Sequence, residues 1–189
     1  GDESIFHGVA QRITILFQGI RDLGSTMTDK QIDPIAQGFE MRTTEALAAF
    51  PNTIGRCVNL CAFIAARLRD DGIQSTVCLG SLSCAGIKTF QYRKAFPRNP
   101  KGPIEWDGHA WLEFLDGRIG EPSLIRTARD QPANSNLRRH LEMLGVLNRG
   151  AILMSKEDAA LSGFKYVRKS ALAQDRERPL IEGLFAISN

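Results

Sequence analysis

The strongest constraint on the fold lies in residues 55–73, where the sequence GRCVNLCAFIAARLRDDGI carries the pattern of one helix. Asn52 and Thr53 precede it as candidate N-cap residues. Gly72 follows as a residue that can end a helix in the left-handed conformation. Apolar side chains recur three and four positions apart and share one face: Leu60, Phe63, Ile64, Ala65 and Leu68. The pattern predicts a helix that packs against the rest of the chain through this face.

Cys57 stands in the first turn of this predicted helix, next to Arg56. The first turn presents unpaired backbone N–H groups and the positive end of the helix dipole, which favour a thiolate over a thiol. Arg56 acts in the same direction. We therefore predict that Cys57 is a nucleophile, with a buried structural cysteine as the alternative. Cys61 lies one turn further along and is interpreted as a packing residue.

Length and composition indicate an ordinary globular protein. The 189 residues suit a single domain over 1–189, and the hydrophobic content is 43%. The formal net charge is +3, and the scattered basic residues do not favour nucleic-acid binding. No apolar run is long enough for a transmembrane helix, and the first residues lack a signal-peptide pattern. We expect a cytoplasmic protein that does not bind membranes.

The four cysteines fit neither a disulfide scaffold nor a zinc site. The chain is too long for its cysteine content to form a disulfide framework. A zinc site needs four ligands at recognisable spacing, and here the cysteine pairs have no histidine nearby. Reduced thiols in a cytoplasm are the simplest interpretation. We expect no metal and no cofactor.

The remaining segments alternate between helical and extended patterns. We predict helices over 4–23, 40–50 (ended by Pro51) and 137–147, and from Ser155 onward. We predict strands or extended segments over 75–81, 90–96, 109–114, 119–124, 150–155 and 164–168. The charged run 175–178 is interpreted as a solvated face. The expected core spans about 52–124, with a C-terminal appendage over about 125–189 that covers it.

His109 opens a strictly alternating segment, in which His109, Trp111 and Glu113 face one side of the predicted strand. A helix-borne cysteine and a strand-borne histidine are the two working parts of a thiol hydrolase. Trp111 is interpreted either as a wall or support of such a site or as a core residue. A third group must hold the imidazole in the right orientation.

Three acidic residues are candidates for this third role: Glu113, Asp116 and Glu121. Glu113 lies on the same strand, roughly 13 Å from His109 at about 3.3 Å per residue. Asp116 belongs to the following turn and lies further away. Glu121 returns on the next strand, and whether it faces His109 depends on the register between the two strands.

The turn at 115–118 decides this register. A two-residue turn at Asp116 and Gly117 would place Glu121 opposite Leu112, pointing away from His109. A three-residue loop with Gly117 in the left-handed conformation would place Glu121 opposite Trp111, on the face of His109. The diagonal distance is then about 7–8 Å between backbones, which a glutamate side chain can bridge. We predict the three-residue loop.

Four short motifs follow one another in this part of the chain: Gly55-Arg56-Cys57, Leu68-Arg69-Asp70-Asp71-Gly72-Ile73, His109-Ala110-Trp111-Leu112-Glu113 and Glu121-Pro122-Ser123. In this order they resemble the transglutaminase-like cysteine protease superfamily. The first and third motifs together are most similar to the leader-peptide proteases of lasso-peptide maturation. The resemblance covers about residues 52–124.

The resemblance implies an α+β fold with a papain-like core, in which the nucleophile helix packs on a small antiparallel sheet. Helical extensions would lie at both ends. It also implies catalytic roles for Cys57 as nucleophile, His109 as base and an acid as the third member. The family usually has Asp-Pro where this chain has Glu121-Pro122, so the resemblance leaves the third role of Glu121 an expectation.

We therefore expect a cysteine hydrolase that cuts a peptide or amide bond of a peptide or protein substrate through a thioester. A transglutaminase, an acyl transferase or a glutamine deamidase would use the same triad, because water or an amine can resolve the thioester. The Cys57 backbone N–H is a candidate oxyanion donor. The non-enzymatic alternative is an inactive domain that binds a peptide. The sequence does not indicate the oligomeric state.

Overall fold

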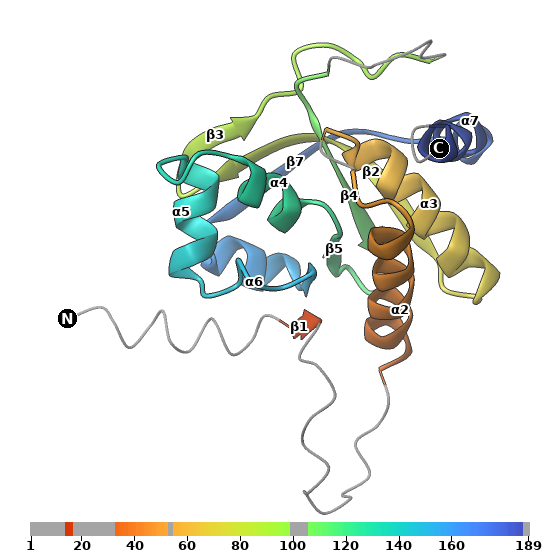
Figure 1. Cartoon of the computed structure of the whole chain (residues 1–189), viewed down its shortest axis with the longest axis horizontal. Helices are drawn as coiled ribbons and strands as arrows, with labels where there is room; N and C mark the ends of the chain where they lie inside the picture. Colours follow the sequence, from red (N-terminus) through yellow and green to blue (C-terminus); the bar gives the residue numbers. More distant parts are fainter. Residues whose placement is uncertain (1–13, 17–32, 53–54, 99–105, 187–189) are drawn as a thin grey trace, which may run out of the picture.

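The described part of the chain forms one antiparallel sheet with helices on both faces (Figure 1). The structure is a computed structural model, and it describes residues 14–16, 33–52, 55–98 and 106–186. Its strands are β1 (Thr14–Leu16), β2 (Ser75–Cys84), β3 (Ile87–Phe90), β4 (His109–Phe114), β5 (Ile119–Glu121), β6 (Ala151–Met154) and β7 (Phe164–Ala171). Its helices are α2 (Pro34–Ala49), α3 (Cys57–Asp70), α4 (Leu124–Asp130), α5 (Asn136–Met143), α6 (Lys156–Leu161) and α7 (Glu177–Phe185), with a 3-10 turn η1 (Gln174–Arg176).

The strand order is β1-β6-β5-β4-β2-β3, and β7 pairs with β2 as well. The long strand β2 pairs through one half with β4, from Ser75 to Gly80, and through the other half with β3. Its opposite edge pairs with β7. The start of β4 and the end of β3 therefore lie next to each other along one edge of β2, which brings their terminal residues together.

Two apolar clusters fill the two faces of the sheet. Ala110, Leu112 and Phe114 of β4 belong to the cluster that also contains the buried residues of α2, α3 and α7. Trp111, between them in sequence, belongs to the other cluster, together with buried residues of α4, α5 and α6. The alternation predicted for this strand is thus confirmed. Figure 1 shows the same division, with α2, α3 and α7 on the right and α4, α5 and α6 on the left.

Helix α2 begins where the sequence provides a complete start signal. Asp33 is the N-cap, and its carboxylate accepts hydrogen bonds from the backbone N–H groups of Ile35 and Ala36. Pro34 occupies the first helical position, where its missing N–H costs nothing. The helix ends before Pro51, as predicted. Arg126 of α4 donates to the carbonyl oxygens of Leu47 and Phe50, so the last turn of α2 is tied to the opposite layer.

Helix α3 begins at Cys57 and ends at Asp70, and Gly72 follows with a φ of 77°. The backbone N–H of Ile73 donates to the carbonyl of Leu68 at 2.8 Å, a bond typical of a helix end at a left-handed glycine. The N-cap prediction is wrong. Arg56 takes this position without a side-chain hydrogen bond, and Asn52 lies outside the helix. Thr53 lies outside the described residues.

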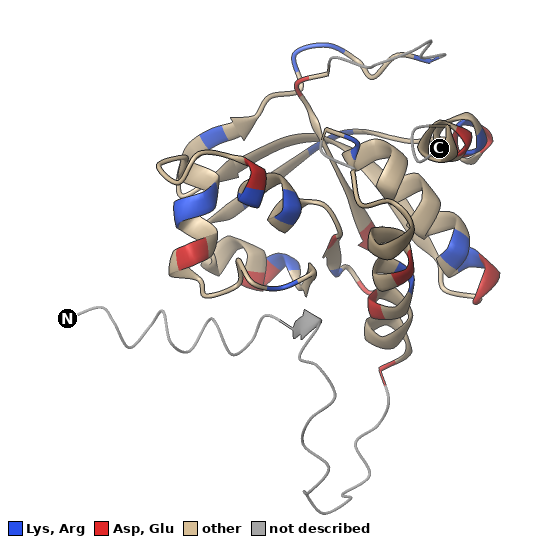
Figure 2. Cartoon of the chain, viewed as in Figure 1, with Lys and Arg blue, Asp and Glu red and all other residues tan. Residues whose placement is uncertain are grey.

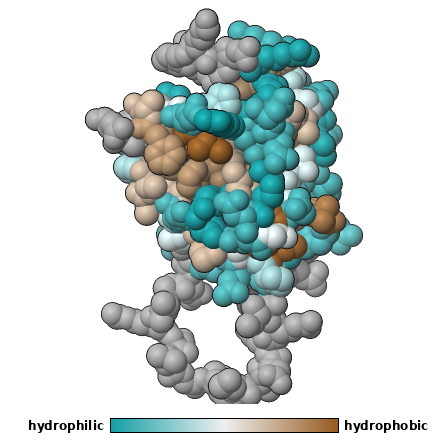
Figure 3. All heavy atoms as spheres, turned by 90° about the vertical axis from the view of Figure 1, so that its right-hand side faces the viewer, coloured by the Kyte–Doolittle hydropathy of each residue, from teal (hydrophilic) through white to brown (hydrophobic). Residues whose placement is uncertain are grey.

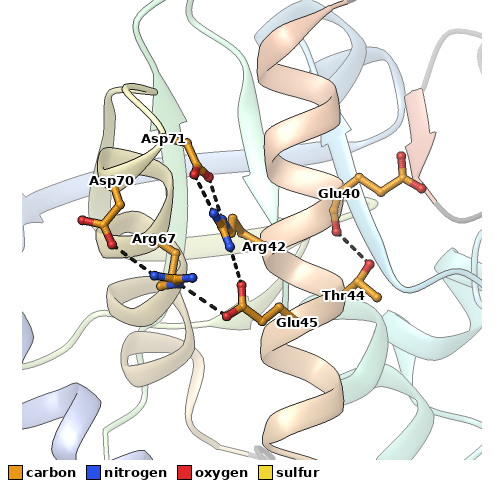
Figure 4. Close-up of polar contacts among 7 residues, drawn as sticks. All are labelled: Glu40, Arg42, Thr44, Glu45, Arg67, Asp70 and Asp71. Carbon is orange, nitrogen blue, oxygen red and sulfur yellow. Dashed lines mark hydrogen bonds and ion pairs between the residues drawn. The ribbon is translucent and has the colours of Figure 1, made fainter.

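Charged side chains join α2 to α3 (Figure 4). The Arg42 guanidinium donates two hydrogen bonds to the Asp71 carboxylate, at 2.6 and 2.5 Å, and a third to Glu45 at 2.8 Å. Arg67 of α3 contacts both Glu45, at 3.4 Å, and Asp70, at 3.2 Å. The two parallel hydrogen bonds from Arg42 to Asp71 fix the relative orientation of the two side chains and are stronger than a single bond. The network fixes how α3 lies against α2.

Helix α7 covers the outer side of α3. Asn59 donates its side-chain N–H to the carbonyl of Leu180 at 2.9 Å. The rings of Phe50 and Phe63 meet edge to face at 5.2 Å, and Phe185 adds a further edge contact to Phe50 at 5.0 Å. Phe185 is 52% exposed. Figure 3 shows this side of the molecule as largely hydrophilic, with a larger hydrophobic area at the upper left and a smaller one at the lower right.

Several predictions about the elements are wrong. The helix predicted over 4–23 is contradicted at Thr14–Leu16, which pair with β6 as a strand; the other residues of that range lie outside the described part. The strand predicted over 90–96 is displaced to Ile87–Phe90. In the run 175–178, Glu177 is buried and binds Arg69 of α3 at 2.9 Å instead of facing solvent.

The described part of 125–189, which ends at residue 186, is joined to the core through the sheet. It provides β6 and β7, which pair with β5 and β2 in the same sheet. The α+β class is confirmed, as a mixed arrangement of helices and an antiparallel sheet. No helix within the described ranges is long and apolar enough to cross a bilayer.

Candidate active site

The sheet topology brings His109 and Glu121 to the same end of two neighbouring strands. His109 is the first residue of β4, and Glu121 is the last residue of β5. Because β4 and β5 run antiparallel, these two ends lie together. The imidazole Nε2 lies 2.8 Å from Oε1 and 3.0 Å from Oε2 of the Glu121 carboxylate. Both side chains are buried, with exposed fractions of 1% and 0%.

The register that permits this contact is the predicted one. Leu112 pairs with Gly120, and Glu113 pairs with Ile119, so the loop contains three residues and Glu121 faces the side of His109. Gly117 has a φ of 86°, the left-handed conformation that this loop requires. The Gly117 N–H donates to the Phe114 carbonyl at 3.0 Å. The three-residue loop is therefore confirmed.

The pKa of His109 is raised to about 10, although burial alone acts in the opposite direction. Desolvation disfavours the imidazolium and would lower the pKa. The charge of Glu121, followed by the hydrogen bonds of Cys57 and of Glu121, together outweigh this effect. The buried pair thus holds a proton on the imidazole at neutral pH.

Cys57 approaches the imidazole from the start of α3. Its side chain is a hydrogen-bonding partner of His109 and contributes to the raised pKa of the imidazole. The other ring nitrogen, Nδ1, is buried and has no partner of ideal geometry within the described ranges. The contact with the thiol is therefore looser than an ideal hydrogen bond. Because Nε2 binds the Glu121 carboxylate, Nδ1 is the ring nitrogen that can exchange a proton with the sulfur of Cys57.

A pocket of about 290 Å³ lies over this pair. Cys57 and Arg56 line it from the start of α3, and His109 and Gly108 line it from the start of β4. Three aromatic side chains provide further walls: Phe90, Phe96 and Trp106. A substrate in this pocket would meet the sulfur and the imidazole together.

The aromatic walls are fixed by contacts of their own. Phe90 stacks on His109, with ring centroids 4.6 Å apart and planes 19° apart. Trp106 donates its indole N–H to the carbonyl of Lys94 at 3.0 Å and meets Phe96 edge to face. A Cβ atom at Gly108 would lie 2.2 Å from the Trp106 ring. The ring therefore packs directly against the backbone of Gly108, next to His109.

Trp111 and Tyr166 lie behind the pair rather than in the pocket. Trp111 is fully buried; its ring lies 6.3 Å from His109 and 5.1 Å from Tyr166. The Tyr166 hydroxyl is buried, and burial followed by the charge of Glu121 raises the pKa of Tyr166 well above its usual value. The Tyr166 phenol therefore stays protonated beside the Glu121 carboxylate. The contact between the hydroxyl and the carboxylate does not have the geometry of an ideal hydrogen bond. Trp111 acts as a core residue that supports the histidine.

The other two acidic candidates are engaged elsewhere. Glu113 binds the indole N–H of Trp111 and lies 3.3 Å from Lys156. Asp116 accepts a hydrogen bond from Arg118 at 2.6 Å in the turn. Neither carboxylate forms a hydrogen bond with His109. Of the three candidates, Glu121 is the one that the fold brings to the imidazole.

The remaining cysteines are poorer nucleophile candidates than Cys57. All four thiols are free, and Cys57 is half-buried whereas the other three are buried. Burial raises the pKa of Cys61 well above its usual value, that of Cys78 to about 12 and that of Cys84 to about 11. These buried thiols stay protonated at neutral pH. The interpretation of Cys61 as a packing residue agrees with its full burial.

Sequence reasoning missed Phe90, Trp106 and Tyr166 as neighbours of the site. Phe90 and Tyr166 lie in stretches with a recognisable strand pattern, but no short-range signal connects them with His109 or Glu121. Trp106 follows a loop rich in Pro and Gly, and this proximity to the His109 motif was its one available signal.

The site contains no recognisable metal centre. Among residues 14–16, 33–52, 55–98 and 106–186, no three His, Cys, Asp or Glu side chains are grouped so that they could hold a metal ion. Comparisons of the chain with protein-family models, with curated proteins and with solved structures found no significant match.

Proposed function

We propose that the chain is a cysteine hydrolase of the transglutaminase-like, papain-like type, which cleaves a peptide or amide bond through a thioester. The observation that carries the proposal is the buried His109–Glu121 pair in contact with the thiol of Cys57 at the wall of one pocket. Cys57 is the nucleophile, His109 the proton carrier, and Glu121 the group that orients the imidazole and stabilises its charge.

In the acylation step, the Cys57 sulfur attacks the substrate carbonyl carbon and forms a C–S bond. The carbonyl oxygen carries the negative charge of the tetrahedral intermediate. The C–N bond then breaks, and the leaving amine takes the proton that His109 holds on Nδ1. The product of this step is a thioester on Cys57 and a free amine.

In the deacylation step, water attacks the thioester carbonyl and gives its proton to His109. The C–S bond breaks, and the acid product leaves. Glu121 keeps Nε2 occupied throughout, so that the same ring nitrogen serves both steps. If an amine enters in place of water, the same geometry performs acyl transfer.

The start of α3 supports the charge changes at sulfur and at the carbonyl oxygen. Arg56 caps the helix without a side-chain hydrogen bond, so the N–H groups of the first turn are not taken by a capping side chain. These groups and the helix dipole favour negative charge at this point. The Cys57 backbone N–H is a candidate donor to the oxyanion.

The proposal is tested by alkylation of the full chain with iodoacetamide between about pH 5 and 9, with the labelled cysteines mapped by mass spectrometry. An ordinary thiol is less than about 1% thiolate at pH 6. We expect selective labelling of Cys57 at that pH, and a rate about 10–100-fold lower in the His109→Gln variant, because the imidazolium that pairs with sulfur is lost.

The His140→Gln variant is the matched control. His140 is also buried, but its Nε2 binds the Ser162 carbonyl at 2.7 Å. This variant should label like the wild type. Slow and unselective labelling of all four cysteines in the wild type would overturn the enzyme proposal and favour a domain that binds peptides without cleaving them.

A further inference from the structure

A second hollow, of about 330 Å³, opens on the sheet next to the pocket of Cys57. Its floor is formed by β2, through Ser81 and Ser83, and its sides by β3, by β7 and by the segment after β3. We call this hollow the basic groove, because Lys88, Arg93, Lys165 and Lys169 line it and no acidic residue does. Strand β3 shows a basic segment in Figure 2.

The charges of the basic groove are mostly uncompensated. Arg93 lies 3.6 Å from Asp107, at the long end of an ion pair. Lys88, Lys165 and Lys169 are exposed and form no ion pair with any residue of the described part. The groove thus presents several positive charges around a partly polar floor, a surface that attracts negatively charged partners.

The basic groove is continuous with the candidate active site through Phe90. Phe90 lines both hollows, and its ring stacks directly on His109. At the other end of the pocket, Arg56 is half-buried and has no ion pair within the described ranges. A chain that passes from the basic groove over Phe90 to Cys57 would meet positive side chains at both ends of its path, in the groove and at Arg56.

Lysines on an exposed strand also have a simpler explanation. Strand β7 pairs only with β2 among the described strands, and charges on an edge strand prevent unwanted pairing. This explanation covers Lys165 and Lys169, and it also covers Lys88, because β3 likewise pairs only with β2 among the described strands. It does not cover Arg93, which lies in the segment after β3 and lines the same hollow.

We propose that the basic groove binds an acidic stretch of the peptide substrate and thereby guides the neighbouring bond to Cys57. This inference rests on the proposed function, and it assigns the substrate class: a peptide with several Asp or Glu residues on one side of the cleaved bond. Glutamate and aspartate side chains would meet the lysines at the rim, where contacts are individually weak and act together.

The test measures binding without turnover. The probe is a fluorescein-labelled 16-residue peptide of alternating Glu and Ser, and its counterpart has Gln in place of Glu. Fluorescence anisotropy with the full chain should show tighter binding of the Glu peptide, weakened by added salt. The K165Q/K169Q variant should bind it about tenfold more weakly, as expected for the loss of two such contacts.

The R139Q/R178Q variant is the control, because it removes the same number of positive charges from exposed positions outside the groove. It should bind like the wild type.

The Glu peptide should also slow iodoacetamide labelling of Cys57 in the wild type. Equal binding of the two peptides, equal loss in both variants, or binding that leaves the labelling of a reactive Cys57 unchanged would each overturn the inference. Self-association of K165Q/K169Q without a change in peptide binding would identify the lysines as edge protection only.

The two proposals fail in distinguishable ways. If Cys57 is inert toward iodoacetamide but the Glu peptide binds, and binds more weakly to K165Q/K169Q, the hydrolase proposal fails and the groove remains a binding site for acidic peptides. If Cys57 is selectively reactive and the two peptides bind alike, the hydrolase proposal stands and the substrate class is wrong.

Discussion

At the scale of single residues, the pair of His109 and Glu121 is the most informative contact in the molecule. Both side chains are removed from water, and each would be costly to bury alone as a charged group. Together they keep the imidazolium stable inside the protein, with the Glu121 oxygens at 2.8 and 3.0 Å from Nε2. The charge state of His109 therefore depends on Glu121 rather than on solvent.

This dependence predicts the behaviour of the Glu121→Gln variant. The amide keeps a hydrogen-bonding oxygen but removes the negative charge, so that burial acts on His109 with less opposition. The pKa of His109, about 10 in the wild type, should fall by about 1–3, the usual effect of losing a charge at this distance. NMR titration of the imidazole carbon and nitrogen signals measures this change.

Glu113→Gln provides the comparison, because Glu113 lies on β4 four positions after His109 and its carboxylate does not contact the imidazole. It should leave the His109 titration near its wild-type value. An unchanged His109 pKa in Glu121→Gln would mean that the carboxylate does not hold the proton on the ring, and the assigned role of Glu121 would be wrong.

At the scale of elements, the position of each strand end decides where the site forms. The β4–β5 hairpin places His109 and Glu121 at one sheet edge, and the junction of β3 with β4 along β2 places Phe90 over His109. Opposite His109, β2 carries Gly80. A Cβ atom there would lie 2.1 Å from the Val167 carbonyl oxygen and 2.9 Å from the Trp111 ring.

The close approach at Gly80 predicts a marked loss of stability in Gly80→Ala. The added methyl group must push β7 away from β2 or move Trp111, and overpacking of this kind costs about 1–3 kcal/mol. Urea unfolding followed by circular dichroism should show this fall in the free energy of unfolding. The Trp111 displacement should also slow labelling of Cys57 through His109.

Gly117→Ala is the matched variant, because nothing lies within 4 Å of the added Cβ and the cost comes from its φ of 86° alone. We expect a loss of about 1 kcal/mol there. If both variants lost the same stability and neither affected Cys57, the close packing at Gly80 would have no part in supporting the site.

At the scale of the whole molecule, two layers of helices hold the sheet from both faces, and the site lies at the rim where α3 begins. The ion pair of Arg69 with the buried Glu177 joins α3 to α7, while the Arg42 network joins it to α2. Arg126 joins the end of α2 to α4 across the sheet edge. The position of Cys57 thus depends on contacts distributed over the fold.

The buried imidazolium also links the stability of the whole fold to pH. In the unfolded chain a histidine has a pKa of about 6.5, and in the fold His109 has a pKa of about 10. The folded state therefore holds the proton more tightly. The stabilisation from this proton is fully present below about pH 6.5 and is lost as the pH rises toward about 10.

We accordingly expect the free energy of unfolding to fall between about pH 6.5 and 10, as measured by urea titration at several pH values. The His109→Gln variant lacks this proton and should show a shallower decline across the same range. A wild-type stability that rises over this range, with the variant following it in parallel, would contradict the raised pKa of His109.

The sequence by itself determined the local features of the site. Helix α3, the alternation of β4 and the left-handed Gly117 follow from patterns of a few residues, because a helix, a strand and a turn each impose their period or conformation on neighbouring positions. Glu121 could be chosen over Glu113 and Asp116 for the same reason, since the short loop fixes the register of the hairpin. The catalytic roles of Cys57, His109 and Glu121 stay predictions.

Only the tertiary structure decided which distant segments meet. It placed β6 and β7 in the sheet, made a strand of Thr14–Leu16, and buried Glu177 against Arg69. It also brought Tyr166 to Glu121, and Phe90 to His109. Strand order and long-range packing depend on burying all the apolar faces at once, a condition that no short stretch of sequence carries.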